Sequence, residues 1–133
     1  MENPQAGPSN RHPTVAPNRP SPIAPFGTTT PTRPMLHYHT IPVTAFQQNC
    51  SLLWCDATSE ATLVDPGGDI DRLLSAVAER GLSLQQIWLT HAHIDHAGGA
   101  GELAETHQLP ITGPHPGDQF WIDGLPQQSA MFG

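Results

Sequence analysis

The prolines of this chain limit where it can fold. Fifteen prolines occur in 133 residues, and nine of them precede Met35. A proline fixes the backbone angle φ and lacks an amide hydrogen, so a segment this rich in proline cannot build a helix or a sheet. The same segment has few apolar side chains to bury. We therefore expect residues 1–34 to be a disordered Pro-rich extension and residues 35–133 to hold the folded domain.

The charge of the second part limits its partners. From Met35 onward, eleven carboxylates stand against only Arg72 and Arg80, and the whole chain lacks lysine. A nucleic-acid surface needs clustered cations, so we expect no nucleic-acid partner. A surplus of carboxylates is compatible with the binding of divalent cations.

The chain has no feature of a membrane or secreted protein. No run of about 18 apolar residues is present, so we expect no membrane-spanning helix and no membrane partner. If Cys50 and Cys55 lie in one strand, they are about 16 Å apart, which is too far for a disulfide. Free thiols and the lack of an apolar secretory signal predict a cytoplasmic protein.

Strand patterns open the folded part. Residues 36–41 alternate apolar and polar side chains, which predicts a strand with one solvent-exposed face, and Pro42 marks its end as an edge or a turn. Residues 51–54 and 61–64 are apolar runs separated by a turn-forming sequence. Together these segments predict a β-meander.

A strand, a helix and a second strand follow. Asp69 is an N-cap residue type, and Arg80 and Gly81 are suited to a helix C-terminus. Between them, apolar residues recur at the spacing of an amphipathic helix, namely Ile70, Leu73, Leu74, Val77 and Ala78. Residues 87–89 predict a parallel strand covered on both faces. In such a unit the loops after both strands meet at one sheet edge, so we expect Asp65 to approach His91.

Four side chains of metal-ligand type follow the second strand within six residues, namely His91, His93, Asp95 and His96. Their offsets fit no single helical face, so we expect a loop folded around metal, followed by a helix over about residues 96–106. Zinc, iron and manganese accept imidazole and carboxylate ligands, and a bound ion activates water near neutral pH. Four groups cannot complete two ions with about four ligands each, so further ligands are expected elsewhere.

The alternative explanation for the histidines is a polar surface loop. Four such side chains compressed into this spacing after an apolar strand make that explanation the weaker one. We expect His37 and His39 on an exposed strand face, and His12, His107 and His115 at the surface.

The segment T-H-A-H-I-D-H-A-G-G, residues 90–99, resembles the signature of the metallo-β-lactamase superfamily. Its flanks narrow the resemblance. They are I-P-V-T-A-F-Q-Q-N-C-S-L-L-W-C at 41–55, L-V-D-P-G-G at 63–68 and G-L-P-Q-Q-S-A-M-F at 124–132. They are similar to the short bacterial glyoxalase-II-like, or hydroxyacylglutathione hydrolase-like, proteins. The similarity runs from about Tyr38 to the last residue.

The resemblance implies an α/β fold, the N-terminal half of a metallo-β-lactamase αβ/βα sandwich. It implies that His91 and His93 bind a first metal and that Asp95 and His96 bind a second, with Asp95 also catalytic. Asp65 is expected beside the metals without binding them. The implied cofactors are two divalent ions, zinc first and iron or manganese as alternatives. The implied reaction is hydrolysis of a glutathione thioester, S-lactoylglutathione, to D-lactate and glutathione.

Two other functions remain open. The same signature occurs in persulfide dioxygenases and lactonases of the superfamily. The resemblance also covers only the N-terminal portion of the family pattern, which lacks the later ligands. We therefore expect this chain to be a truncated form of the thioester hydrolase, with little activity of its own. The third possibility is a fragment that has no catalytic function.

Overall fold

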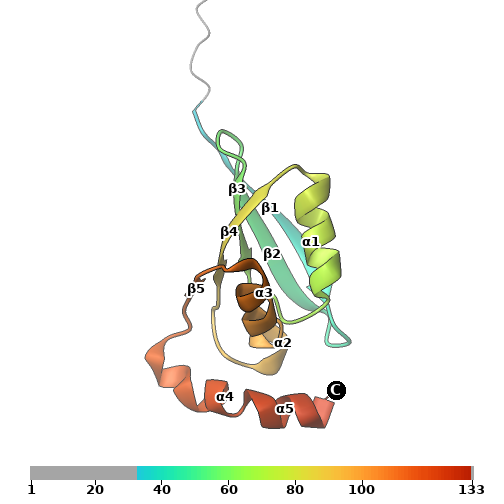
Figure 1. Ribbon diagram of the computed structural model, residues 1–133, viewed down its shortest axis with the longest axis vertical. Coiled ribbons are helices and arrows are strands. Elements are labelled where there is room, and N and C mark those ends of the chain that lie inside the picture. The colour runs from blue at the N-terminus through green and yellow to red at the C-terminus, as the bar shows by residue number, and fades with distance from the viewer. Residues whose placement is uncertain (1–32, 133) are drawn as a thin grey trace, which may run out of the picture. The chain divides into compact units, whose positions relative to one another are not determined.

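The computed structural model describes residues 33–132 (Figure 1). The predicted disorder of the extension falls on residues that lie almost entirely outside this range, as does His12. The boundary at residue 34 therefore stays a prediction.

Five strands form one mixed sheet in the order β1-β2-β3-β4-β5. They are β1 (Leu36–Val43), β2 (Gln48–Cys55), β3 (Glu60–Val64), β4 (Ser83–Trp88) and β5 (Ile111–Thr112). The first three are antiparallel, which confirms the meander, and β3, β4 and β5 are parallel. The predicted α/β class is thus confirmed. Pro42 lies within β1, which is possible because β1 is an outer strand of the sheet.

The helices follow β3 in the chain. They are α1 (Ile70–Glu79), α2 (Ile94–Ala97), α3 (Ala100–His107), α4 (Gln119–Asp123) and α5 (Leu125–Phe132), with a 3-10 helix at Pro116–Asp118. In Figure 1, α1 and α3 lie in front of the sheet, and α4 and α5 lie below it. Among residues 33–132, no helix has the length and apolar character needed to cross a bilayer.

The core lies between the sheet and the helices α1 and α3. Leu52, Leu63 and Ile87 are paired side by side on three adjacent strands and are fully buried. Leu73 of α1 and Leu103 of α3 pack into the same cluster. Burial of one such side chain contributes about 1.5–3 kcal/mol, so this cluster fixes α1 and α3 against the strands.

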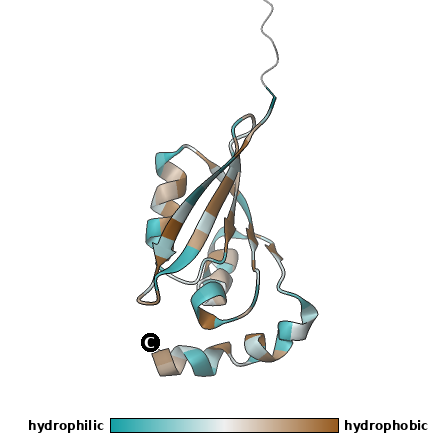
Figure 2. Ribbon diagram, turned by 180° about the vertical axis from the view of Figure 1, so that it is seen from behind, coloured by the Kyte–Doolittle hydropathy of each residue, from teal (hydrophilic) through white to brown (hydrophobic). Residues whose placement is uncertain are grey.

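The opposite face of the sheet is only partly covered, which corrects one expectation. Trp88 was expected in a strand covered on both faces, but its side chain is 40% exposed. Leu36 and Tyr38, whose positions in β1 fall on the face opposite to that of the buried Ile41 and Val43, are also exposed. Figure 2, seen from behind, shows hydrophobic positions along these strands. The apolar run at residues 87–89 is therefore not a guide to burial on both faces.

Helix α1 follows its predicted pattern with two differences. Leu73 and Val77 are buried as expected, and Gly81 ends the helix at a φ of 63°. Ala78 is exposed, and Ala76 packs against the core instead. Asp69 precedes the helix but makes no side-chain cap; its Oδ2 accepts from the backbone N–H of Thr44 at 2.8 Å. Asp69 therefore ties the β1–β2 turn to the helix.

The helix predicted at about residues 96–106 is divided. Asp95 and His96 already belong to α2, and the chain bends at Gly98 and Gly99 before α3 begins. The bend arises because Gly99 donates its backbone N–H to the carbonyl of Pro66 at 3.1 Å. This hydrogen bond holds the metal-ligand motif in contact with the turn that follows β3.

The turn after β3 and helix α2 touch through their backbones. A Cβ atom built on Gly67 would lie 1.6 Å from the backbone oxygen of Asp95, and one on Gly99 would lie 2.6 Å from that of Pro66. Only glycine permits such an approach. These two glycines therefore set the distance between Asp65 and the motif.

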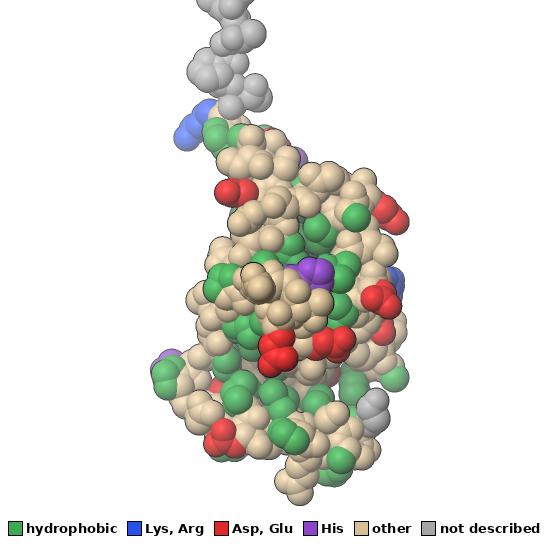
Figure 3. All heavy atoms as spheres, in the orientation of Figure 1, with side chains coloured by type: hydrophobic (Ala, Val, Ile, Leu, Met, Phe, Trp, Pro, Cys, Tyr) green, Lys and Arg blue, Asp and Glu red, His purple; other side chains and the backbone are tan. Residues whose placement is uncertain are grey.

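Helices α4 and α5 are held from one side only. Neither contains a buried residue. Figure 3 shows hydrophobic side chains gathered over them, and Phe120, Met131 and Phe132 are more than half exposed.

The two cysteines lie in one strand, β2, and both are free, as predicted. Burial, together with the negative charge of Asp65, raises the pKa of the Cys50 thiol to about 12. Hydrogen bonds from the backbone of Ala57 and Thr58 lower the pKa of the Cys55 thiol.

We predict that iodoacetamide modifies Cys55 at least about 100-fold faster than Cys50 in the native protein near pH 8, because the thiolate is the reactive species. Mass spectrometry of the digested protein measures both rates. Denatured protein is the control, where the two rates should converge. Equal rates in the native protein would contradict the burial of Cys50.

We also predict that Gly67→Ala destabilises the fold by about 3 kcal/mol or more, because the added methyl group overlaps the Asp95 carbonyl. Gly101→Ala is the matched control. A Cβ there meets no atom within 4 Å, and alanine in helix α3 should stabilise by up to about 1 kcal/mol. Urea unfolding measures both free energies. Similar effects of the two substitutions would argue against the close approach.

Candidate metal centre

The candidate site lies where the parallel strands β3 and β4 end. Val64 and Trp88 are register partners, and Asp65 donates its backbone N–H to the carbonyl of Trp88 at 2.9 Å. Both strands end at this edge of the sheet, which is where ligand sites usually lie in a parallel sheet. Asp65 and His91 accordingly lie close together, with polar atoms within 4.8 Å of each other and of His96.

A buried carboxylate organises this edge. Asp65 is 5% exposed and has a φ of 54°. Its Oδ1 accepts from the backbone N–H of Thr90 at 2.7 Å, and its Oδ2 accepts from the Thr90 hydroxyl at 2.6 Å. The same Oδ2 lies 3.0 Å from Nδ1 of His96. A carboxylate only accepts hydrogen bonds, so His96 donates through Nδ1.

Thr90 extends this network to a second histidine. Its hydroxyl lies 3.0 Å from Nδ1 of His91. Because the hydroxyl hydrogen is directed to Asp65, its oxygen accepts from His91. One carboxylate thus orients both rings. It bonds directly to His96, and it acts on His91 through the hydroxyl of Thr90.

The motif side chains cluster around these two rings. The ring centroids of His91 and His96 are 3.9 Å apart, and those of His91 and His93 are 4.7 Å apart. Asp95 lies 3.5 Å from Nε2 of His96 through its Oδ2. The structure therefore gathers His91, His93, Asp95 and His96 at one place, although the last two stand on α2 rather than in a loop.

This donor set fits a divalent metal ion. Imidazole nitrogens and carboxylate oxygens are ligands for zinc, iron and manganese. In metal sites, a ligating histidine usually gives its other ring nitrogen to a carboxylate or another protein group. Nδ1 of His91 and of His96 is used in this way, which leaves each Nε2 for an ion.

Distance alone would group Asp65 with His91 and His96 as ligands. We assign Asp65 a different position in the network. Both of its oxygens already accept hydrogen bonds from Thr90, and it meets the Nδ1 side of His96. An ion bound at Nε2 would lie on the far side of that ring.

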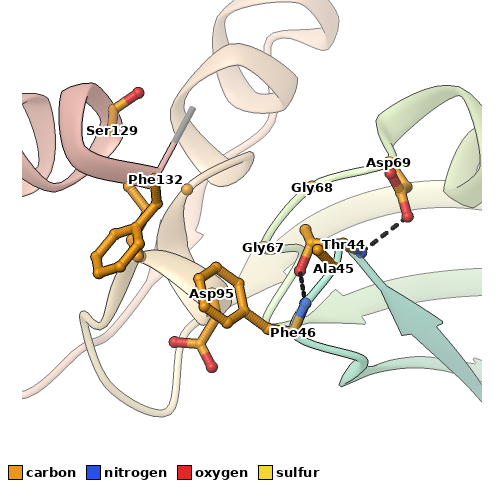
Figure 4. A pocket seen from close by; sticks show the side chains of 11 residues that line it. Thr44, Ala45, Phe46, Gly67, Gly68, Asp69, Asp95, Ser129 and Phe132 are labelled. Atoms are coloured by element: carbon orange, nitrogen blue, oxygen red, sulfur yellow. Dashed lines mark hydrogen bonds between the residues drawn. The ribbon is translucent and has the colours of Figure 1, made fainter.

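A cavity of about 410 Å³ opens beside the motif (Figure 4). Its walls come from the β1–β2 turn, the turn after β3, α2 and α5. Figure 4 shows the Asp95 carboxylate beside the ring of Phe46. Phe46 meets Phe132 edge-on at 5.5 Å, so the turn and the last helix contact each other across the mouth. Trp121 packs edge-on against His93 at 4.6 Å.

Three residues of this site were not foreseen from the sequence, namely Thr90, Trp121 and Gln48, whose Nε2 lies 3.2 Å from Nδ1 of His96. Thr90 could have been found, since a hydroxyl between a strand and a metal-ligand motif is well placed to bond to it. Gln48 and Trp121 come from distant segments with no local signal.

The remaining histidines stay outside the cluster. His37 stacks on Trp54 at 5.5 Å and lies 3.3 Å from Asp56, so it is half-buried rather than fully exposed. His39, His107 and His115 are exposed, as expected.

Comparison with known proteins agrees with this geometry. The family model of the metallo-beta-lactamase superfamily matches residues 43–133. Hydroxyacylglutathione hydrolase GloC of Haemophilus influenzae is 45% identical over 93 residues, which cover 70% of this chain and 43% of that protein. The chain thus spans less than half the length of this relative.

Two solved structures share the fold. The di-iron-bound form of TTHA1623 superposes with a TM-score of 0.62 at 30% identity, over 70% of this chain and 46% of that one. ETHE1 from Myxococcus xanthus gives 0.55 at 31% identity, over 60% and 36%. The sheet and helices described above correspond to the N-terminal half of this fold. The chain belongs to the metallo-β-lactamase superfamily, with hydroxyacylglutathione hydrolases among its relatives.

Proposed function

We propose that a protein carrying this segment is a metal-dependent thioester hydrolase of glyoxalase II type, converting S-lactoylglutathione to D-lactate and glutathione. One observation carries the proposal. Three imidazoles and a carboxylate gather at the carboxyl edge of the parallel strands, with two of the rings held by Asp65 and Thr90. The name of the relative from H. influenzae supports a hydroxyacylglutathione as the substrate class.

The proposed ligand assignment follows the motif. His91 and His93 would hold one divalent ion, and Asp95 and His96 a second, with zinc as the first choice and iron or manganese as alternatives. The di-iron form of TTHA1623 supports a pair of ions. Four side chains cannot complete two ions with about four ligands each, so we propose that the 133-residue chain alone binds metal weakly and hydrolyses little.

The chain's own residues prepare the site for hydrolysis. Bound divalent ions would supply activated water and polarise the thioester carbonyl. Asp65 and Thr90 hold the Nδ1 hydrogens of His96 and His91, so that Nε2 of each ring is left for an ion. Phe46 and Phe132 narrow the cavity mouth beside Asp95, which limits the access of bulk water to a bound thioester. Asp95 is the residue we propose as both ligand and catalytic group.

A second candidate is a sulfur oxidation of the persulfide dioxygenase type, or hydrolysis of a lactone. The structural similarity to ETHE1 is compatible with the first of these. A substrate screen with a measurement of oxygen uptake separates them, because a dioxygenase consumes oxygen, whereas the thioester hydrolase and the lactonase do not and differ in their substrates. A third candidate is a fragment with no catalytic activity.

The setting of the protein is also a proposal. We propose a cytoplasmic protein that binds a small glutathione thioester and neither nucleic acid nor membrane, with residues 1–34 as an extension and residues 35–133 as a partial metallo-β-lactamase-fold domain. The excess of carboxylates over Arg72 and Arg80 supports the lack of a nucleic-acid partner.

We predict that, in a protein with the family's full length that carries this segment, His91→Ala or Asp95→Ala lowers zinc affinity by at least about 100-fold, because each removes a ligand and even residues behind the ligands change affinity by about 10–100-fold. Competition with a chromophoric chelator measures the affinity. The same variants should lose S-lactoylglutathione hydrolysis.

His107→Ala is the matched control, since His107 is exposed on α3 outside the cluster. It should leave both quantities unchanged, and all variants should unfold at similar temperatures without metal. Unchanged zinc affinity in His91→Ala and Asp95→Ala would refute the assignment of the metal site.

A further inference from the structure

The segment between His91 and His93 is held from the start of α4. Ala92, which separates these two histidines, is fully buried, and its backbone N–H donates to Oδ2 of Asp118 at 3.2 Å. Asp118 lies 26 residues further along the chain, where the 3-10 helix ends and α4 begins. The contact therefore joins the middle of the metal-ligand motif to a helix outside it.

This contact satisfies a backbone group that has no other partner. Among residues 33–132, the N–H of Ala92 makes no hydrogen bond except the one to Asp118. A buried backbone N–H without an acceptor is destabilising, so nearly all such groups are paired. Loss of the Asp118 carboxylate would leave a buried donor unpaired inside the motif.

The carboxylate of Asp118 does not serve its own helix. Aspartate is a favoured N-cap residue, because its side chain can accept from a backbone N–H in the first turn of a helix. Asp118 occupies the N-cap position of α4 and makes no such bond. Its side chain bonds to Ala92 instead, so helix capping does not account for this aspartate.

The bond acts on the neighbouring histidines through the geometry of the peptide group. The N–H of Ala92 belongs to the planar peptide unit that begins at Cα of His91. An acceptor that fixes the direction of this N–H therefore limits rotation of the plane between the two residues. The ring centroids of His91 and His93 are 4.7 Å apart, and rotation of the plane would change this spacing.

His93 depends on this backbone support more than the other two imidazoles. The rings of His91 and His96 are each held by a hydrogen bond at Nδ1. Within the described part of the chain, the exposed ring of His93 makes no hydrogen bond. It packs edge-on against Trp121 of α4 at 4.6 Å. Helix α4 thus meets this histidine through its ring and meets the preceding residue through Asp118.

We propose that Asp118 is a positioning residue for His91 and His93. By accepting from the N–H of Ala92, its carboxylate sets the spacing of the two rings and makes the start of α4 part of the candidate metal centre. The importance of this for hydrolysis rests on the proposed function, in which both histidines bind one ion. The effect on the spacing of the rings does not.

Two substitutions of Asp118 test this role in the isotope-labelled, metal-free 133-residue chain. Asp118→Ala removes the acceptor, so amide hydrogen exchange at Ala92 should quicken by about 10-fold or more. Nuclear Overhauser contacts between the ring protons of His91 and His93 should weaken in the same variant. Asp118→Asn keeps a neutral oxygen acceptor, which is weaker than a carboxylate. Its exchange rate should lie between the other two, with the ring contacts retained.

Asp123 provides the matched control within the same helix. It is an exposed aspartate whose Oδ1 accepts from Nε2 of Gln119 at 2.8 Å. Asp123→Ala and Asp123→Asn remove the same charge from α4 and should leave exchange at Ala92 and the ring contacts unchanged. Effects as large as those of the Asp118 variants would overturn the proposal, because they would arise from α4 as a whole.

The outcomes also separate this proposal from the proposed function. Unchanged exchange at Ala92 or unchanged ring contacts in folded Asp118→Ala would overturn the role of Asp118, as would Asp118→Asn that behaves like Asp118→Ala. If Asp118→Ala does not fold, exchange in Asp118→Asn no faster than in the unchanged chain would overturn it. Zinc affinity is measured separately in a protein with the family's full length. Unchanged affinity beside altered ring contacts would count against His91 and His93 as ligands and would leave the role of Asp118 intact.

Discussion

The buried carboxylate of Asp65 is the contact on which the site depends. It accepts hydrogen bonds from the backbone and hydroxyl of Thr90 and from His96, and so joins the end of β3 to the segment after β4. A buried carboxylate without these donors would be strongly destabilising. The hydroxyl of Thr90 in turn accepts a hydrogen bond from His91, so the orientation of this second ring also depends on Asp65. The hydrogen bonds that stabilise the turn are therefore the same ones that orient the imidazoles.

The sheet supplies the frame for this contact. Parallel pairing of β3 and β4 makes both chains leave at the same edge, and the core between the strands and helices α1 and α3 keeps that edge rigid. Backbone contact at Gly67 and Gly99 then sets how closely the turn and α2 approach. A site built this way takes its precision from the main chain, while Phe46 lines the cavity and Trp121 packs against His93.

Much of this arrangement could be predicted from the sequence where the signal is local. The spacing from Ile70 to Val77 predicted α1, and the order of apolar segments predicted the parallel pair and the meeting of Asp65 with the motif. Contacts between residues far apart in the sequence could not be predicted from it. The bend at Gly98 and Gly99 depends on a bond to Pro66, and the exposure of Trp88 depends on which sheet face the helices cover. The extension and the ligand roles remain predictions.

Helices α4 and α5 have a consequence for the energetics of the whole site. They bury no residue of their own. Their aromatic contacts reach the motif, where Trp121 packs against His93, and the cavity, where Phe132 packs against Phe46. Segments with so little burial open with small free energies. By thermodynamic linkage, a ligand that binds in the cavity adds its binding free energy to the stability of the ordered helices. The indole of Trp121 is thus a built-in optical reporter of the state of His93.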